Sequence, residues 1–529
     1  MPTPRFDCVV IGSGAGGGTV AGRLALAGSK VLLIERGDDP TFHSLRRDHL
    51  RNQRLSRYGH NAGPDSRHPR EDGRSGRIVL PHEPAYHANA AVLGGGTRVY
   101  GAQAWRFHPL DFRMASTYGV PEGSSLADWP IDYADLAPWY TRAEETIGVC
   151  GDATTDTHLP SPRPAYPMPP LPVPPQGAAM RRAAQTLGWK CTTVPLAINS
   201  VPRGGRPACI GCQYCVGFGC PVDAKNGSRN TLVEAGLASG NLTVRTGTFA
   251  TKLRHLQGTV THVDVVNEEG VEALSAGQFV VAAGAIETAR LLMVSGLGGD
   301  LVGRNLQGHV YTGVIGLLPE PVRDGNGPGV STATCRWSHG NDGVVGGGML
   351  ADEFVPLPIV AWKRLLPPDI PRLGREAKRW MVENYRFLAE IKGPIQDIPT
   401  PEARVVLSSA TDRWGMPIAR LEGATHAESL RTARFLHAKA VEWMRACGAA
   451  EVWGDAPGGR PLSGGQHQAG TCRMGEDPAR SVVDPWQRVH GFANLHIGDA
   501  SVHVTNGGFN PVLTIYALSL RLADRLASV

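Results

Sequence analysis

A glycine-rich turn near the start of the chain constrains its fold more than any other feature. Residues 6–37 read FDCVVIGSGAGGGTVAGRLALAGSKVLLIERG. The apolar run over residues 8–11 predicts a buried parallel strand that breaks into the glycines, followed by a helix over 19–27 and a second strand over 31–34. Strand, glycines, helix and strand in this order predict a βαβ unit that binds a dinucleotide.

Several residues of this unit have a physical role in such a site. Gly12 permits the tight turn, Gly14 lets the backbone approach a pyrophosphate, and Gly17 lets the helix lie close to the strand. Amide N–H groups at the start of the helix then face the phosphates. Glu35, at the end of the second strand, can accept hydrogen bonds from a ribose. The candidate dinucleotide-binding residues of this unit are Gly12, Ser13, Gly14, Ala15, Gly17, Glu35 and Arg36.

Length and composition limit the class of protein. The chain has 529 residues, 42% of them hydrophobic, enough for a large core in two or three structural units. A net charge of +5 without a long basic tract gives no reason to expect a nucleic-acid partner. The first strand begins by residue 8, which leaves no room for a secretory signal, and no apolar run approaches the roughly 20 residues of a membrane span. We therefore expect a soluble, cytoplasmic protein, whose oligomeric state stays open.

A second glycine-rich segment, AVLGGGTRVYGAQAWRF over residues 91–107, leaves backbone exposed that can approach a flat ligand. At this point the chain resembles the glucose-methanol-choline (GMC) oxidoreductases, FAD enzymes that oxidise alcohols. In that family a similar segment runs along the flavin, and some members attach FAD covalently through a His within it. Aligning the glycines puts Val99 at that position, so the resemblance implies non-covalent FAD. It adds Gly95, Thr97, Val99 and Gly101 to the candidate cofactor-binding residues.

Three later segments extend the resemblance. NLTVRTGTFA over residues 241–250 corresponds to a segment beside the adenine, and AAGAIETARLL over 282–292 resembles the second family signature, which implies Ala250 and Ala283 as cofactor contacts. VGRNLQGH matches a further recurring segment and ends at His309. The resemblance places His309 at the crossing between domains, as a structural rather than a catalytic residue.

The C-terminal part carries the candidate catalytic residues. GGQHQAGTCRMG spans residues 464–475, and a strand over 494–497 leads through a glycine loop into a terminal helix. The GMC active site pairs a His with a second His or an Asn, and the matching residues here are His467 and Asn510. The resemblance also puts Asp499 beside the ribityl chain of FAD. The candidate cofactor contacts of this part are Asp499, Ala500, Asn510, Pro511 and Thr514.

Chemistry independently favours a His and Asn pair. Removing hydride from an alcohol carbon becomes feasible when the hydroxyl proton is taken at nearly the same time, and neutral imidazole accepts a proton near pH 7. We expect His467 to be this base and Asn510 to orient the hydroxyl oxygen by donating a hydrogen bond, with flavin N5 as hydride acceptor. His503 is the alternative base, and His490 and His496 have weaker claims.

Asn510 limits the class of substrate that we expect. Within the resemblance it favours a secondary alcohol of a sugar or glycoside, oxidised to a ketone, as in pyranose oxidases and sugar dehydrogenases. A sterol or another alcohol is the alternative substrate. Oxygen, a quinone or another acceptor would reoxidise the flavin. Trp362, Trp380, Tyr385 and Trp414 are aromatic side chains that could stack on a sugar ring.

Four cysteines, Cys209, Cys212, Cys215 and Cys220, lie close together in CIGCQYCVGFGCPVDAKN. The gaps resemble a bacterial ferredoxin run, which has three rather than four residues before its last cysteine. Such thiols can hold an iron–sulfur cluster or zinc, form disulfides or pack as thiols, and disulfides or packed thiols are the favoured interpretation. Because some GMC dehydrogenases carry a cluster, a flavoprotein subunit that passes electrons to a partner stays an alternative. A nucleotide-binding scaffold without redox activity is a further alternative, which the His467 and Asn510 pair argues against.

Other segments indicate how the chain is divided. The arginine-rich residues 42–82 predict a loop or lid, the proline run over 160–175 predicts an extended strap, and residues 427–447 predict an amphipathic helix. We expect an α/β protein with a discontinuous, Rossmann-like FAD-binding domain and a substrate domain built on a mainly antiparallel sheet with helices. This is the GMC and p-hydroxybenzoate hydroxylase type of architecture. The FAD-binding domain would comprise residues 1–159, 209–309 and 463–529, and the substrate domain residues 160–208 and 310–462.

Overall fold

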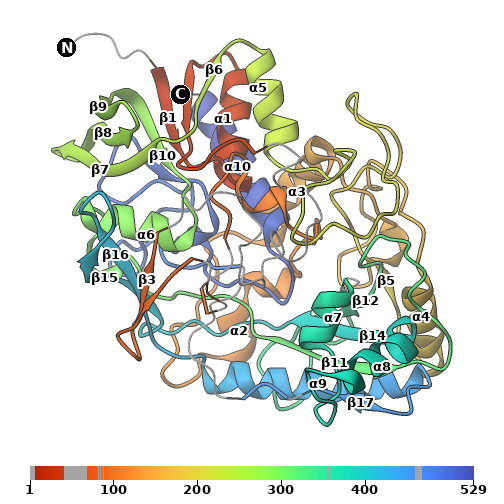
Figure 1. The fold of residues 1–529 in the computed structure, drawn as a ribbon. Helices are drawn as coiled ribbons and strands as arrows, with labels where there is room; N and C mark the ends of the chain where they lie inside the picture. Colours follow the sequence, from red (N-terminus) through yellow and green to blue (C-terminus); the bar gives the residue numbers. More distant parts are fainter. Residues whose placement is uncertain are drawn as a thin grey trace.

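The computed structural model describes residues 6–40, 68–81, 83, 85–86, 89–353, 357–454, 456–458 and 467–528. Residues 42–67 and 82 of the arginine-rich segment therefore lie outside the described residues. Two sheets organise the described chain, a parallel one in the upper part of Figure 1 and an antiparallel one at the lower right.

The parallel sheet has five strands from distant parts of the sequence. Their order is β18 (Leu495–Ile497), β10 (Ala276–Val281), β1 (Phe6–Ile11), β2 (Val31–Ile34) and β6 (Leu242–Arg245), and every neighbouring pair is parallel. The apolar residues of its central strands β1 and β2 are buried, as expected for a parallel sheet covered on both faces. Helix α1 (Ala15–Leu26) packs against this sheet, α5 (Glu234–Ala238) and the C-terminal helix α10 (Val512–Ala527).

The second sheet has six strands, and its pairs are antiparallel. Their order is β17 (Val452–Trp453), β11 (Tyr311–Leu317), β14 (Leu388–Pro394), β13 (Leu350–Asp352), β12 (Thr332–Thr334) and β5 (Thr192–Thr193). Helix α9 (Ala427–Ala446) lies along the outer face of this sheet (Figure 1). Its buried side chains, Ala433, Leu436, Ala440 and Trp443, recur at helical spacing and form a core with the sheet.

Two smaller sheets flank these. One has the order β15 (Arg404–Thr411), β16 (Pro417–Glu422), β3 (Arg70–Asp72) and β4 (Ile78–Val79), and the other is β7 (Phe249–Leu256), β8 (Thr259–Asn267) and β9 (Gly270–Leu274). The remaining α-helices are α2 (Met114–Tyr118), α3 (Tyr133–Ile147), α4 (Pro175–Thr186), α6 (Ala285–Val294), α7 (Pro358–Arg364) and α8 (Arg375–Asn384). Short 3-10 helices span Gly95–Arg98, Pro109–Phe112, Ala153–Thr155, Gly299–Leu301, Tyr385–Phe387 and Ala500–Val502, and one π-helical turn spans Arg229–Val233.

The expected fold class is confirmed, with one difference at the first helix. This helix begins at Ala15 rather than near residue 19, because the glycines themselves form its first turn. A Cβ on Gly16 would lie 1.7 Å from the carbonyl oxygen of Gly498, so only glycine allows the helix this close to the neighbouring loop.

The proline run adds no regular element before α4. The division into FAD-binding and substrate domains stays a prediction. Among the described residues, no helix has both the length and the apolar composition needed to span a membrane.

Candidate active site

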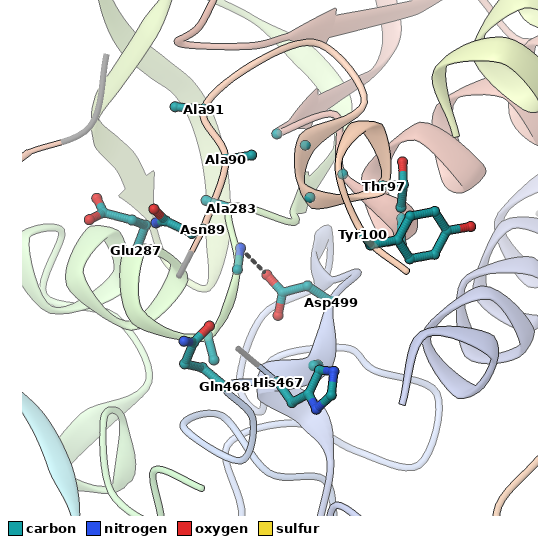
Figure 2. A pocket seen from close by; sticks show the side chains of 18 of the residues that line it. Asn89, Ala90, Ala91, Thr97, Tyr100, Ala283, Glu287, His467, Gln468 and Asp499 are labelled. Atoms are coloured by element: carbon teal, nitrogen blue, oxygen red, sulfur yellow. Dashed lines mark hydrogen bonds between the residues drawn. The ribbon is translucent and has the colours of Figure 1, made fainter. Parts of the chain in front are cut away.

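A cavity of about 890 Å³ lies between the two main sheets. Its lining includes Ile11 and Ile34, where β1 and β2 end, and Tyr311 and Lys392 from the antiparallel sheet. Figure 2 shows Thr97, His467 and Asp499, from distant parts of the sequence, around this cavity. Open parallel sheets bind ligands at the carboxyl ends of their strands, so this position is the expected one for a nucleotide cofactor.

Most of the predicted cofactor-binding residues line the cavity. They are Gly12, Ser13, Gly14, Ala15, Glu35, Arg36, Gly95, Thr97, Val99, Gly101, Ala250, Ala283, Asp499, Ala500, Asn510 and Pro511. Gly17 and Thr514 lie outside this lining. A Cβ on Gly17 would come within 1.9 Å of the Gly12 carbonyl oxygen, so this glycine serves helix packing. The Thr514 hydroxyl forms a hydrogen bond of 2.7 Å with Tyr140 inside the core.

The start of α1 has the properties of an anion-binding site. Gly14 is its N-cap, and no side chain caps the helix and no acidic residue lies in its first turn. A Cβ on Gly14 would meet no atom of the described chain within 4 Å, although other glycines of the same turn are tightly packed. Uncapped N–H groups that open onto a cavity favour a phosphate. The residues present therefore fit the pyrophosphate of FAD.

Two buried carboxylates are fixed in the cavity wall. Glu35 accepts hydrogen bonds from the Ser13 hydroxyl at 2.6 Å and from the Gly37 N–H at 3.0 Å. Asp499 accepts from the Gly284 N–H at 2.9 Å (Figure 2) and from the Thr288 hydroxyl at 2.6 Å. Burial raises the pKa of both carboxyls, and these hydrogen bonds act against that rise. Hydrogen bonds thus hold both carboxylates in place in the cavity wall.

The predicted catalytic pair is brought together at the same cavity. Asn510 Nδ2 lies 3.4 Å from Nε2 of His467 and donates a hydrogen bond of 3.3 Å to the Tyr311 hydroxyl. That hydroxyl is also 3.4 Å from Nδ1 of His467. His467 has φ of +77°, a left-handed conformation that costs roughly 1–3 kcal/mol outside glycine. Asn506 holds this backbone by donating a hydrogen bond of 2.7 Å to the His467 carbonyl oxygen.

The other histidines lie differently. His503 is fully buried with Nδ1 3.1 Å from Oδ1 of Asn506, and His490 lies 2.9 Å from the Ser481 hydroxyl; neither they nor His496 line the cavity. His309, expected as a structural residue between domains, instead lines the cavity with Nδ1 2.9 Å from Nδ1 of His467. One indication of this contact was present in the sequence, because the segment that ends at His309 resembles a segment that recurs in the GMC family.

Several residues that line the cavity were not among those predicted to lie in the site. Its further lining residues include Arg70, Asp72, Arg74, Glu83, Tyr86, Tyr100, Tyr311, Glu353, Arg364, Lys392 and Gln468. The four aromatic residues that could have stacked on a sugar do not line this cavity, namely Trp362, Trp380, Tyr385 and Trp414. Trp414 instead stacks on Phe249 with ring centroids 4.7 Å apart, and Trp380 packs edge-on against Trp453.

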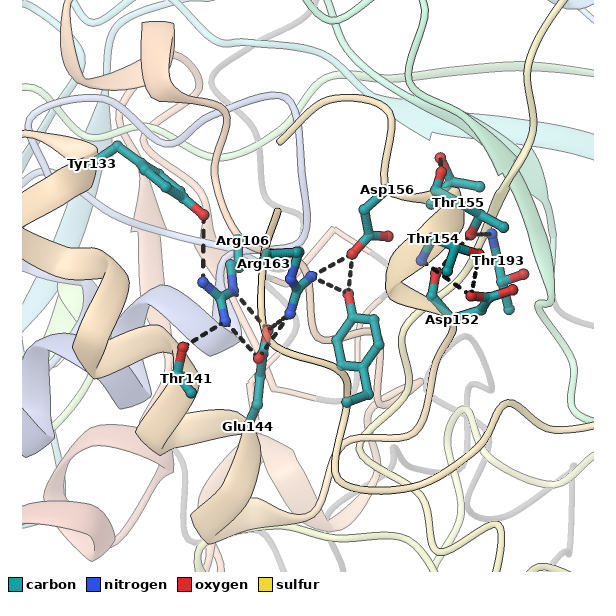
Figure 3. A network of polar contacts seen from close by, with 12 residues as sticks. Arg106, Tyr133, Thr141, Glu144, Asp152, Thr154, Thr155, Asp156, Arg163 and Thr193 are labelled. Carbon is teal, nitrogen blue, oxygen red and sulfur yellow. Dashed lines mark hydrogen bonds and ion pairs between the residues drawn. The ribbon is translucent and has the colours of Figure 1, made fainter. Parts of the chain in front are cut away.

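A buried polar network joins α3 to the residues that follow it in the chain (Figure 3). Glu144 on α3 accepts hydrogen bonds from Arg106 at 2.7 and 2.6 Å and from Arg163 at 2.9 Å. Arg163 also pairs with Asp156, which accepts a hydrogen bond of 2.8 Å from Tyr166. The network ties the proline strap to α3. Two residues beyond Asp156, the ring of His158 stacks on Phe509, the neighbour of Asn510, with centroids 4.9 Å apart.

The four clustered cysteines surround a separate cavity of about 10 Å³, together with Lys225. All ten cysteines of the chain are free thiols, so the disulfide interpretation is wrong. Among the described residues, no group of three or more His, Cys, Asp or Glu side chains is arranged to hold a metal ion. The buried Lys225 Nζ donates to the carbonyl oxygens of Tyr100 at 3.0 Å and Phe218 at 2.9 Å, which docks this loop against the wall of the large cavity.

The parallel sheet, the glycine turn and the paired His467 and Asn510 on one cavity define a nucleotide-dependent oxidoreductase that acts on alcohols. The chain belongs to the GMC oxidoreductases, since the N-terminal and C-terminal models of that family match residues 7–311 and 399–519. It is 32% identical to paromamine 6'-oxidase of Streptomyces fradiae, over 99% of this chain and 91% of that protein. Identity to the fructose dehydrogenase large subunit of Gluconobacter japonicus is 27%, over 99% and 98% of the two chains.

The solved structures agree on the fold. Pyridoxine 4-oxidase from Mesorbium loti superposes with a TM-score of 0.65 at 22% identity, covering 98% of this chain and 99% of that one. An FAD-dependent oxidoreductase from Chaetomium thermophilum gives a TM-score of 0.61 at 16% identity. GMC enzymes use FAD, and the cavity described above has the residues to bind it.

Proposed function

We propose that this enzyme oxidises a hydroxyl group of a sugar or an aminoglycoside-like glycoside, with His467 as base and Asn510 orienting the hydroxyl. The observation that carries the proposal is the convergence of His467, Asn510 and the Tyr311 hydroxyl within 3.4 Å of one another, on the cavity that also contains Asp499 and the glycine turn. A base and a hydrogen-bond donor next to a nucleotide cavity are the groups that alcohol oxidation requires.

The residues of the site would have the following roles in the reaction. FAD, when bound, supplies the acceptor for the hydride of the alcohol carbon. The neutral imidazole of His467 accepts the hydroxyl proton, and the Asn510 amide fixes the hydroxyl oxygen. The strained backbone of His467, held by Asn506, keeps the ring in place before the substrate arrives. The enclosing antiparallel sheet excludes water from the reaction.

FAD is proposed to be held without a covalent bond. Val99 lines the cavity where the family resemblance sets the covalent His of some members, and an aliphatic side chain forms no such link. The test is an absorption spectrum before and after acid precipitation. Flavin bands that move wholly into the supernatant support the proposal, whereas flavin retained in the pellet contradicts it.

The substrate class draws on relatives that are named for such substrates, a paromamine oxidase, a 6'''-hydroxyparomomycin C oxidase and a fructose dehydrogenase. The proposed reaction converts a secondary alcohol into a ketone. Paromamine, fructose and simple glycosides would be screened anaerobically for flavin reduction, and the product carbonyl identified by NMR. Oxygen, a quinone and a dye acceptor would then be compared as oxidants of the reduced enzyme. Free thiols throughout the chain agree with a reducing, cytoplasmic location.

The experiment that tests the base is His467→Ala. This variant is expected to keep bound FAD but to lose most of its reduction by substrate, a loss of about 100-fold or more for a general base. His490→Ala is the matched control, because His490 contacts Ser481 away from the cavity. A His467→Ala enzyme that is reduced at the wild-type rate would show that the assignment is wrong.

A second candidate function is electron transfer through an iron–sulfur cluster on Cys209, Cys212, Cys215 and Cys220. The observation in its favour is that all four cysteines line one small cavity, beside the wall of the large cavity. The cavity that they enclose has room for about one water molecule, so the thiols as they stand do not fit a cluster. We therefore propose that these four cysteines are packed thiols that hold no cluster. Iron and acid-labile sulfide in the purified protein, with broad absorbance that bleaches in acid, would instead establish the cluster.

A further inference from the structure

His309 and His467 meet ring to ring, although 158 residues separate them in the sequence. Their Nδ1 atoms are 2.9 Å apart, and the ring planes are nearly perpendicular at 78°. At this distance one nitrogen carries a proton and the other accepts it in a hydrogen bond. Which one donates decides where the proton of His467 sits.

The far side of His309 determines this direction. Its Nε2 lies 3.1 Å from the carbonyl oxygen of Asn506 and 2.9 Å from that of Gly507. Carbonyl oxygens only accept, so Nε2 of His309 carries a proton. The ring is buried, and burial lowers the pKa of His309 to about 4, so the ring is neutral near pH 7 and has a single N–H. Its Nδ1 therefore has a lone pair and accepts.

We propose that His309 is a positioning residue that holds His467 in the tautomer with its proton on Nδ1, which makes Nε2 of His467 the atom that accepts the substrate's hydroxyl proton. The chain of hydrogen bonds runs from Nδ1–H of His467 to Nδ1 of His309, and from Nε2–H of His309 to the backbone carbonyls that precede Asn510. The role of Nε2 as base rests on the proposed function, whereas the tautomer does not.

The orientation of Asn510 agrees with this assignment. Its Nδ2 faces Nε2 of His467 at 3.4 Å, a contact that is favourable only if Nε2 has a lone pair. The reversed amide would turn its oxygen toward that lone pair. His467 and Asn510 both line the cavity, where a substrate hydroxyl would meet the two groups. The backbone thus sets the tautomer, and the tautomer sets which ring nitrogen of His467 has the lone pair.

Two nearly isosteric variants separate this role from a purely structural one. His309→Asn and His309→Leu both remove the ring nitrogen that bonds the carbonyls of Asn506 and Gly507. The Asn side chain still offers an acceptor oxygen near the position of Nδ1, and its NH2 group is attracted to the carbonyl side. Leu offers no acceptor. If His309 acted only by filling space, the two variants would leave the same tautomer on His467.

The measurement is 15N NMR of histidine-labelled holoenzyme, with the His467 signals assigned by their loss in His467→Gln. In the wild-type protein and in His309→Asn, we expect Nδ1 of His467 to be protonated and Nε2 unprotonated. In His309→Leu we expect this preference to be lost, with the Nε2 resonance shifted toward the protonated position. An Nε2-protonated His467 in the wild type, or the same tautomer in His309→Leu and His309→Asn, would overturn the proposal.

The wild-type spectrum alone can overturn the proposal, even if His309→Leu does not fold. It also keeps this proposal apart from the proposed function. If the wild-type His467 has its proton on Nδ1 but His467→Ala is reduced as fast as the wild type, the assignment of His467 as the base is wrong and the tautomer assignment stands. A His467 with its proton on Nε2, combined with a loss of flavin reduction in His467→Ala, would exclude the tautomer assignment and leave the base assignment standing.

Discussion

The amide Nδ2 of Asn510 donates a hydrogen bond of 3.3 Å to the hydroxyl oxygen of Tyr311. Asn510 follows the C-terminal glycine loop, whereas Tyr311 opens β11 of the antiparallel sheet. The bond therefore joins the two halves of the cavity at the place where the substrate hydroxyl is expected. It anchors the amide that orients this hydroxyl.

Replacing Tyr311 by Phe removes this anchor and keeps the ring. Tyr311→Phe is expected to slow flavin reduction by about tenfold, which corresponds to about 1.4 kcal/mol, the order of one neutral hydrogen bond. Rapid-mixing absorbance under anaerobic conditions measures the rate. The control is Tyr385→Phe, since Tyr385 lies outside the cavity lining. Equal rates for the wild type and Tyr311→Phe would show that the hydroxyl has no part in orienting Asn510.

Gly14 and Gly17 are expected to respond differently to added side chains. A Cβ on Gly14 meets no described atom within 4 Å and enters the proposed phosphate site, so Gly14→Val should lose most of its bound FAD while the apoprotein keeps its melting temperature. A Cβ on Gly17 would meet the Gly12 carbonyl oxygen at 1.9 Å, so Gly17→Ala should destabilise the apoprotein by about 1–3 kcal/mol. Thermal unfolding and flavin content separate the two effects. If Gly14→Val retained as much FAD as the wild type, the assignment of the start of α1 as the phosphate site would be wrong.

Glu144 is a carboxylate between two buried guanidinium groups, and its side chain is only 1% exposed. Glu144→Gln leaves Arg106 and Arg163 without their shared negative charge. We expect a loss of about 3–5 kcal/mol in the free energy of unfolding, the usual cost of breaking a buried pair. Urea denaturation measures this loss. Glu145→Gln, at the exposed neighbouring position of the same helix, should change stability by less than about 0.5 kcal/mol.

His158 is expected to make stability depend on pH. Burial lowers the pKa of this histidine from 6.5 to about 3, so below pH 6.5 the unfolded chain binds a proton that the folded chain does not. The folded wild type therefore loses stability through this group as the pH falls. His158→Phe keeps the stacking on Phe509 and removes the titration. The free energy of unfolding of His158→Phe minus that of the wild type should be larger at pH 5 than at pH 7 by about 2 kcal/mol. Denaturation curves at both pH values test this difference, and a pH-independent difference would contradict it.

Much of the fold followed from local sequence patterns. The second strand at residues 31–34, helix α9 and the terminal helix lie where apolar periodicity and turn residues predict them. These patterns act over a few residues, which is why a sequence reveals them. The glycine turn and His467 with Asn510 were found for the same reason, because each belongs to a short motif.

The sequence by itself predicted the βαβ unit around the glycine turn and, through the family resemblance, the pairing of His467 with Asn510. Only the tertiary structure decided that His309 and Tyr311 contact this pair, that four cysteines gather as thiols, and that Trp414 packs on Phe249 rather than in the cavity. These contacts join residues far apart in the chain. Their existence depends on which strands are neighbours and in what register, and this follows from packing of the whole core rather than from any local pattern.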